Sequence, residues 1–77
     1  MAKRRISVTF PRELLSEPII YTISQQFNLV TNIYQADIET AQNRSSMTLD
    51  IDGRSEDIEA GITWIISKGV RVDVAVD

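Results

Sequence analysis

The chain has 77 residues and a net charge of −3 at pH 7, and it contains neither cysteine nor histidine. The missing cysteines exclude disulfides, thiolate metal sites and cysteine-ligated iron–sulfur clusters, and the missing histidines remove the commonest general base and neutral metal ligand. A chain of this length builds one small core, so we expect one domain over residues 1–77, with stability gained from pairing of subunits.

The first third of the chain predicts a strand followed by a helix. Residues 5–10 alternate, with Ile6, Val8 and Phe10 on one face, which is typical of a half-buried strand that Pro11 would end. Apolar residues then recur at helical spacing over residues 17–27. Ser16 is suited to cap the start of that helix, and Asn28 is suited to end it in the left-handed conformation.

The next strand, residues 29–39, contains a polar amide at Asn32, a residue type that is disfavoured in the middle of a strand. One parity of this strand becomes apolar toward its end, which predicts that Tyr34, Ala36 and Ile38 face the core. Ile33 would then lie on the opposite face, although a bulge would reverse this parity locally.

The second half repeats the pattern of the first. Residues 40–46 read as a polar turn, and residues 45–52 alternate as another strand. Ser55 is a candidate cap for a helix whose buried stripe is expected from four isoleucines: Ile58, Ile62, Ile65 and Ile66. Gly69 follows Lys68 as a helix stop, and residues 70–76 alternate as the last strand.

This order predicts an α+β fold, the ferredoxin-like βαββαβ plait. Its four-stranded antiparallel sheet has the order 4-1-3-2 and carries both helices on one face. On the open face we expect Thr31, Ile33 and Gln35 of the second strand beside short hydroxyl side chains of its neighbours. Such a face, or an adjoining sheet edge, is a candidate interface for a dimer or another partner, and the alternative is a plain solvated sheet.

Several functions are excluded or disfavoured by the sequence. The open face lacks the base-stacking aromatic residues of an RNA-binding plait on its central strands, and the net charge is acidic, so no nucleic-acid partner is expected. There is no phosphate-binding or dinucleotide-binding glycine motif, and the segment 50–53 fails the spacing of a calcium loop. We therefore predict a binding module rather than an enzyme, without cofactor or metal. The absence of a long apolar run or signal sequence predicts a cytoplasmic chain without membrane insertion.

From Ile6 to Val76 the sequence resembles the NIL domain, which is named after an Asn-Ile-Leu motif on its second strand. The motif reads Asn32-Ile33-Tyr34 here, so its third position departs from leucine. Further similarities are Pro18 at the start of the first helix, the acidic opening of the second helix and the segment 68–74. In that family the domain is the C-terminal regulatory portion of ATP-binding subunits of methionine importers, where it binds L-methionine and inhibits transport. It also occurs fused to ferredoxin modules and as a stand-alone chain.

The resemblance implies that Asn32 and Ile33 are ligand-binding residues. An asparagine amide both donates and accepts hydrogen bonds, which suits the ammonium and carboxylate of an amino acid, and an isoleucine suits a thioether side chain. The leading hypothesis is a stand-alone, homodimeric regulatory domain that binds L-methionine or a related amino acid. The alternative is that Asn32 only bonds the backbone at a bulge or bend. The chain would then be a protein-interaction module that docks a transporter or sulfur-metabolism partner through its exposed sheet.

Overall fold

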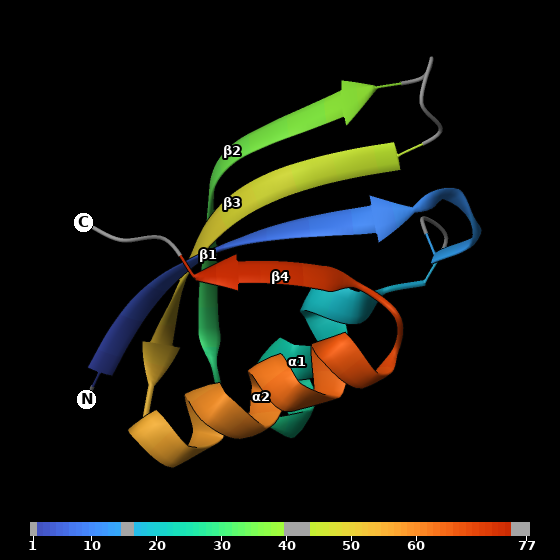
Figure 1. Cartoon of the computed structure of the whole chain (residues 1–77). Coiled ribbons are helices and arrows are strands. Elements are labelled where there is room, and N and C mark those ends of the chain that lie inside the picture. The colour runs from blue at the N-terminus through green and yellow to red at the C-terminus, as the bar shows by residue number, and fades with distance from the viewer. Residues whose placement is uncertain (1, 15–16, 40–43, 75–77) are drawn as a thin grey trace.

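The computed structural model describes residues 2–14, 17–39 and 44–74. Along the chain the elements are β1 (Ala2–Pro11), the 3₁₀ turn η1 (Arg12–Leu14), α1 (Ile19–Gln26), β2 (Val30–Glu39), β3 (Arg44–Gly53), α2 (Ser55–Ser67) and β4 (Arg71–Val74). The strands form one antiparallel sheet in the order β2-β3-β1-β4, and both helices lie on the same side of it (Figure 1). The predicted ferredoxin-like α+β plait is confirmed, including the strand order.

Several element boundaries differ from the sequence prediction, most clearly at both ends of β1 and at the start of α1. β1 begins at Ala2 rather than at residue 5, because β3 is long enough to pair with all of it, from Ala2 opposite Gly53 to Pro11 opposite Arg44. Pro11 is the last residue of β1 instead of the first residue after it. The helix α1 begins at Ile19, two residues later than expected, and the predicted cap Ser16 lies outside the described residues.

The helix ends follow the predicted backbone conformations. Asn28 has a φ of 55° and Gly69 a φ of 96°, so both adopt the left-handed conformation that terminates a helix. The predicted cap of α2 was wrong by one residue, because Ser55 is already helical and Arg54 occupies the cap position without a side-chain hydrogen bond. Glu56 lies in the first turn, where its negative charge is favourable to the helix dipole.

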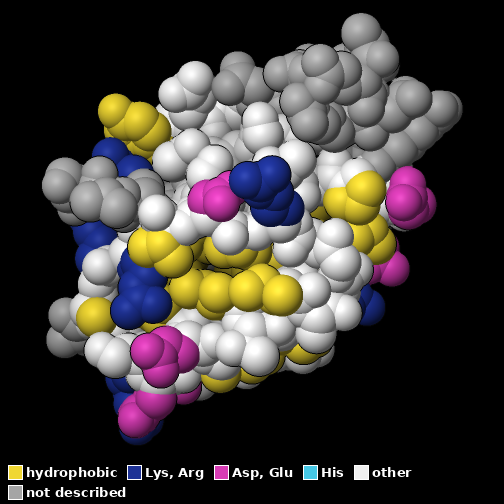
Figure 2. Space-filling model, viewed as in Figure 1, with side chains coloured by type: hydrophobic (Ala, Val, Ile, Leu, Met, Phe, Trp, Pro, Cys, Tyr) yellow, Lys and Arg dark blue, Asp and Glu magenta, His cyan; other side chains and the backbone are white. Residues whose placement is uncertain are grey.

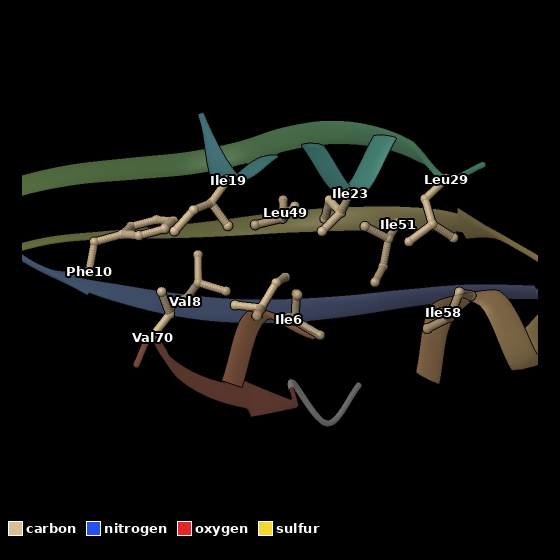
Figure 3. Close-up of a cluster of buried hydrophobic side chains, with 11 residues drawn as sticks. Ile6, Val8, Phe10, Ile19, Ile23, Leu29, Leu49, Ile51, Ile58 and Val70 are labelled. Carbon is tan, nitrogen blue, oxygen red and sulfur yellow. The ribbon is translucent and has the colours of Figure 1, made fainter. Parts of the chain in front are cut away.

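The core lies between the sheet and the two helices and joins residues far apart in the sequence (Figure 3). Full burial of a valine, leucine, isoleucine or phenylalanine side chain stabilises a fold by roughly 1.5–3 kcal/mol. Ile66 was expected in the core but is 54% exposed, because it lies about 100° further round α2 than the buried Ile65. The buried residues are Ile6, Val8, Phe10, Ile19, Ile23, Leu29, Leu49, Ile51, Ile58, Ile65 and Val70.

The facing of β2 is decided by its pairing with β3. Ile33 lies opposite the buried Leu49 and Thr31 opposite the buried Ile51, so both take the helix side of the sheet. A register shift follows between Ile33 and Gln35, after which Gln35 lies opposite Thr48 on the open face. The expectation that Thr31 and Ile33 face the open side was wrong, and the expectation for Gln35 was correct.

Tyr34 is the residue that this irregularity inserts, and its predicted position in the core was wrong. Its side chain is 63% exposed, and the guanidinium carbon of Arg5 lies 4.1 Å from the centre of its ring. Arg5 belongs to the open face of β1, so Tyr34 lies there too. Beyond the bulge Ala36 pairs with Met47 and returns to the helix side as predicted, whereas the predicted facing of Ile38 lies outside the described side chains.

Candidate ligand site on the open face of the sheet

Asn32 lies at the end of a polar row that crosses three strands on the open face. In the ladder, Asn32 of β2 is the partner of Asp50 of β3, and Asp50 is in turn the partner of Arg5 of β1. Side chains of directly paired residues project from the same face and stand about 5 Å apart. The exposed amide of Asn32 therefore adjoins the acidic Asp50, and the basic Arg5 follows one strand further along the row.

Arg5 and Asp50 form a two-pronged ion pair. The Arg5 Nε donates to Asp50 Oδ1 at 2.8 Å, and Nη2 donates to Oδ2 at 3.2 Å. Such paired hydrogen bonds fix the orientation of both groups as well as their separation. The side chains are 35% and 16% exposed, respectively, so the pair is partly shielded from water and yet reachable from the open face.

The ion pair changes the titration of the acid. The hydrogen bond from Arg5 lowers the pKa of Asp50 below its ordinary value of 3.8, and the positive charges of Arg5 and Lys3 act in the same direction. Partial burial opposes this shift without reversing it. Asp50 therefore carries a negative charge throughout the neutral range, as a partner for a cationic group requires.

Tyr34 completes the arrangement from the bulge of β2. Its ring accepts the Arg5 guanidinium on one face, a cation–π contact that holds the guanidinium over the strand. Val30 lies on the same face, since its ladder partner is Asp52, and its side chain is 55% exposed. The open face thus presents an amide, two opposite charges and two apolar side chains on three adjacent strands.

The structure brings only part of the predicted site together. Asn32 lies beside Asp50, the partner of Arg5, but the side chain of Ile33 takes the other side of the sheet and is 61% exposed at its edge. Binding by Asn32 and Ile33 and an interface at Thr31, Ile33 and Gln35 stay predictions. Arg5 and Asp50 were not predicted as site residues. Strand alternation is enough to place both on the open face, but their pairing depends on the register of β1 and β3.

The described part of the chain contains neither a cluster of metal-ligating side chains nor a membrane-spanning helix. Within residues 2–14, 17–39 and 44–74 no group of three or more acidic side chains is placed to hold a metal ion. In the same ranges every buried side-chain nitrogen or oxygen has a hydrogen-bond partner. Neither described helix has the length and apolarity that a membrane crossing requires.

Comparison with known proteins agrees with this architecture. A model of the NIL domain matches residues 4–74. The chain is 30% identical over 73 residues to the methionine import ATP-binding protein MetN 2 of Bacillus licheniformis. The aligned region covers 92% of this chain and 21% of that relative. The chain therefore spans about a fifth of the length of the curated relative it matches.

A solved structure extends the similarity to three dimensions. It is the crystal structure of the C-terminal domain of an ABC transporter ATP-binding protein from Enterococcus faecalis, with a TM-score of 0.83 and 25% identity. The match covers 96% of this chain and 84% of that one, so it includes the sheet and both helices. With the family match spanning all elements from β1 to β4, this chain belongs to the NIL domain family.

Proposed function

We propose that the chain is a non-enzymatic regulatory domain that binds L-methionine or a closely related amino acid on its open sheet face. The observation that carries the proposal is the position of Asn32, an exposed amide paired in the ladder with a charged acid. The membership of the chain in the NIL domain family and its similarity to a methionine import ATP-binding protein support the same ligand class.

The open face offers complementary chemistry for a zwitterion. The Asn32 amide can accept a hydrogen bond from an ammonium group and donate one to a carboxylate. Asp50 adds a fixed negative charge next to it, and Arg5 adds a fixed positive charge on the following strand. The apolar part of the ligand would contact Tyr34 and Val30, which share this face, rather than the Ile33 side chain of the same chain.

Thermal denaturation with and without L-methionine tests the proposal, with Asn32→Ala as the variant. At a ligand concentration a hundred times its Kd, binding stabilises a fold by about 2.7 kcal/mol, which raises Tm by about 10 °C or more in a domain of this size. We expect that rise for the original chain and its loss in the variant. Gln25→Ala removes an exposed amide of α1 and should keep the full rise. No rise in the original chain at millimolar methionine would refute the proposal.

We further propose that the regulatory form is a homodimer paired through β2. This strand is ten residues long and lies at the edge of the sheet, where Val30, Ile33 and Tyr34 are all more than half exposed. A long edge with apolar side chains is a template for pairing with another strand. Sedimentation at tens of micromolar should show a dimer, and Ile33→Lys should give a monomer. Ile66→Lys changes an isoleucine of similar exposure on α2 and should leave the dimer intact.

The same edge also supports a second candidate function, docking of a transporter or sulfur-metabolism protein without any metabolite. The relationship to ATP-binding transporter subunits favours a partner of that kind. A pull-down from native lysate with the original chain and with Ile33→Asp separates the two candidates. Loss of a specific partner in the variant, together with no response to methionine, would favour docking.

A further inference from the structure

An apolar groove lies on the helix side of the sheet, between the start of α1 and the part of the β2–β3 pair where Ala36 lies opposite Met47. Its volume is about 300 Å³, at the lower end of the range for small-molecule sites. Five elements contribute to its apolar wall, principally through Phe10, Leu14, Ile20, Ala36 and Met47. Phe10 is 6% exposed and forms a fixed part of the wall, while Met47 is a flexible side chain that can adapt to an occupant.

One charged residue, Glu17, lines the groove. Ser45 adds a hydroxyl on the β3 side, because it pairs with the buried Phe10 and so takes the helix side of the sheet. A carboxylate and a hydroxyl can both accept a hydrogen bond from an ammonium group, and the carboxylate repels an anion. An apolar wall with a single negative charge at its rim is complementary to an apolar chain that ends in a cation.

Glu17 is engaged only weakly within the chain. Its nearest cation is Lys68, whose Nζ lies 3.8 Å from Glu17 Oε2, which is long for a charge-assisted hydrogen bond. The two side chains are 44% and 40% exposed, and a pair of this kind contributes little to stability. A carboxylate also has lone pairs for more than one donor, so a second cation in the groove can share Glu17 with Lys68.

We propose that this groove binds small primary amines with an unbranched apolar chain, with the chain against Phe10 and Met47 and the ammonium group at Glu17. The site goes beyond the proposed amino-acid function, because Ala36 and Met47 lie on the opposite side of the sheet from Asn32. No α-carboxylate is needed at the groove, so the ligand class differs as well.

Titration by NMR with n-pentylamine, 1-pentanol and pentanoate tests the proposal, since a primary amine is protonated at pH 7. We expect shifts at the groove residues, with the amine binding about three- to fivefold more tightly than the alcohol. Each added methylene from butylamine to hexylamine should improve affinity about three- to fourfold until the groove is full. Glu17→Gln should make amine and alcohol equal, while Glu13→Gln, an exposed acid outside the lining, should change nothing.

Blocking the space provides the second arm. Ala36→Phe fills the groove from β2 and should abolish the shifts for all three probes, whereas Ala60→Phe on the exposed side of α2 should not. Amine binding that survives Ala36→Phe would overturn the proposal, as would pentanoate binding that equals amine binding. Because n-pentylamine has no carboxylate and its shifts are followed at the groove, failure here would leave the methionine response of the Asn32 face unaffected.

Discussion

The two sides of β2 present opposite kinds of surface to solvent. On the open face, Arg5 and Asp50 are joined by two hydrogen bonds and covered by Tyr34. On the helix side, Ala36 and Met47 border an open groove whose wall is almost entirely apolar. The first surface is a set of fixed charges, which selects a ligand by the arrangement of its charged groups. The second is an apolar groove, which selects a ligand by the length of its apolar chain.

The separation of these surfaces follows from the bulge between Ile33 and Gln35. Without it, strict alternation from Ile33 would place Tyr34 and Ala36 together on the open face, and Ala36 would not border the groove. The extra residue leaves Tyr34 beside Arg5 and returns Ala36 to the helix side. One extra residue in an edge strand therefore produces a charged face and an apolar one.

The largest expected effect comes from the core that both surfaces share. Leu49 is fully buried beneath them, so Leu49→Ala should lower the free energy of unfolding by about 2–5 kcal/mol. Urea denaturation measures this loss. Thr48→Ala, on the open face of the same strand, should change the free energy by less than about 0.5 kcal/mol. Equal effects at the two positions would contradict the assignment of the two sides.

A smaller effect, and one that depends on pH, is expected at the ion pair. Because the pKa of Asp50 is lowered in the folded state, its pairing stabilises the fold fully above the unfolded pKa near 3.8. The stabilisation is lost as the pH falls through the lower folded pKa. The original chain should exceed Asp50→Asn in stability by a constant amount from neutral pH to about pH 5, and the difference should shrink in stronger acid.

Urea denaturation at several pH values measures that difference. Asp73→Asn is the matched control, since Asp73 pairs with Arg71 at an exposed position where both side chains are more than half accessible. The control should show little difference from the original chain at any pH. A stability difference for Asp50→Asn that does not vary between pH 7 and pH 2 would show that the ion pair is not its cause.

The aromatic cover of the ion pair should have a further, modest effect. Tyr34→Leu keeps an apolar side chain but removes the ring that contacts Arg5, and it should cost about 0.5–1 kcal/mol. The cost should disappear when Arg5 is already replaced by Gln, a double-mutant test of the contact. Additive losses in the double variant would mean that Tyr34 stabilises the fold in some other way.

The smallest effect is expected where the groove is filled. Ala36 is exposed and borders open space, so Ala36→Leu should change the free energy of unfolding by no more than about 0.5 kcal/mol. Thermal denaturation is the measurement. A loss above 1 kcal/mol would indicate that the groove is closed in solution, and the contrast between the two sides of β2 would then fail.

Much of the fold was predictable because its signals are local. Alternation in the strands and the left-handed ends at Asn28 and Gly69 depend on neighbouring residues, and these set the element order and hence the topology. The facing of Tyr34 was not predictable in this way. Its residue type fits either side, and the side that it takes depends on the register of β2 with β3.

The candidate sites divide along the same line. The sequence by itself determined that Asn32 lies in a strand of a four-stranded plait and that this polar residue required an explanation. Only the tertiary structure decided that Asp50 and Arg5 continue its row across the sheet and that Phe10, Ala36 and Met47 border a groove. The physical reason is that both surfaces join residues far apart in the chain. Their proximity depends on strand register and helix packing, which no single segment of the sequence encodes.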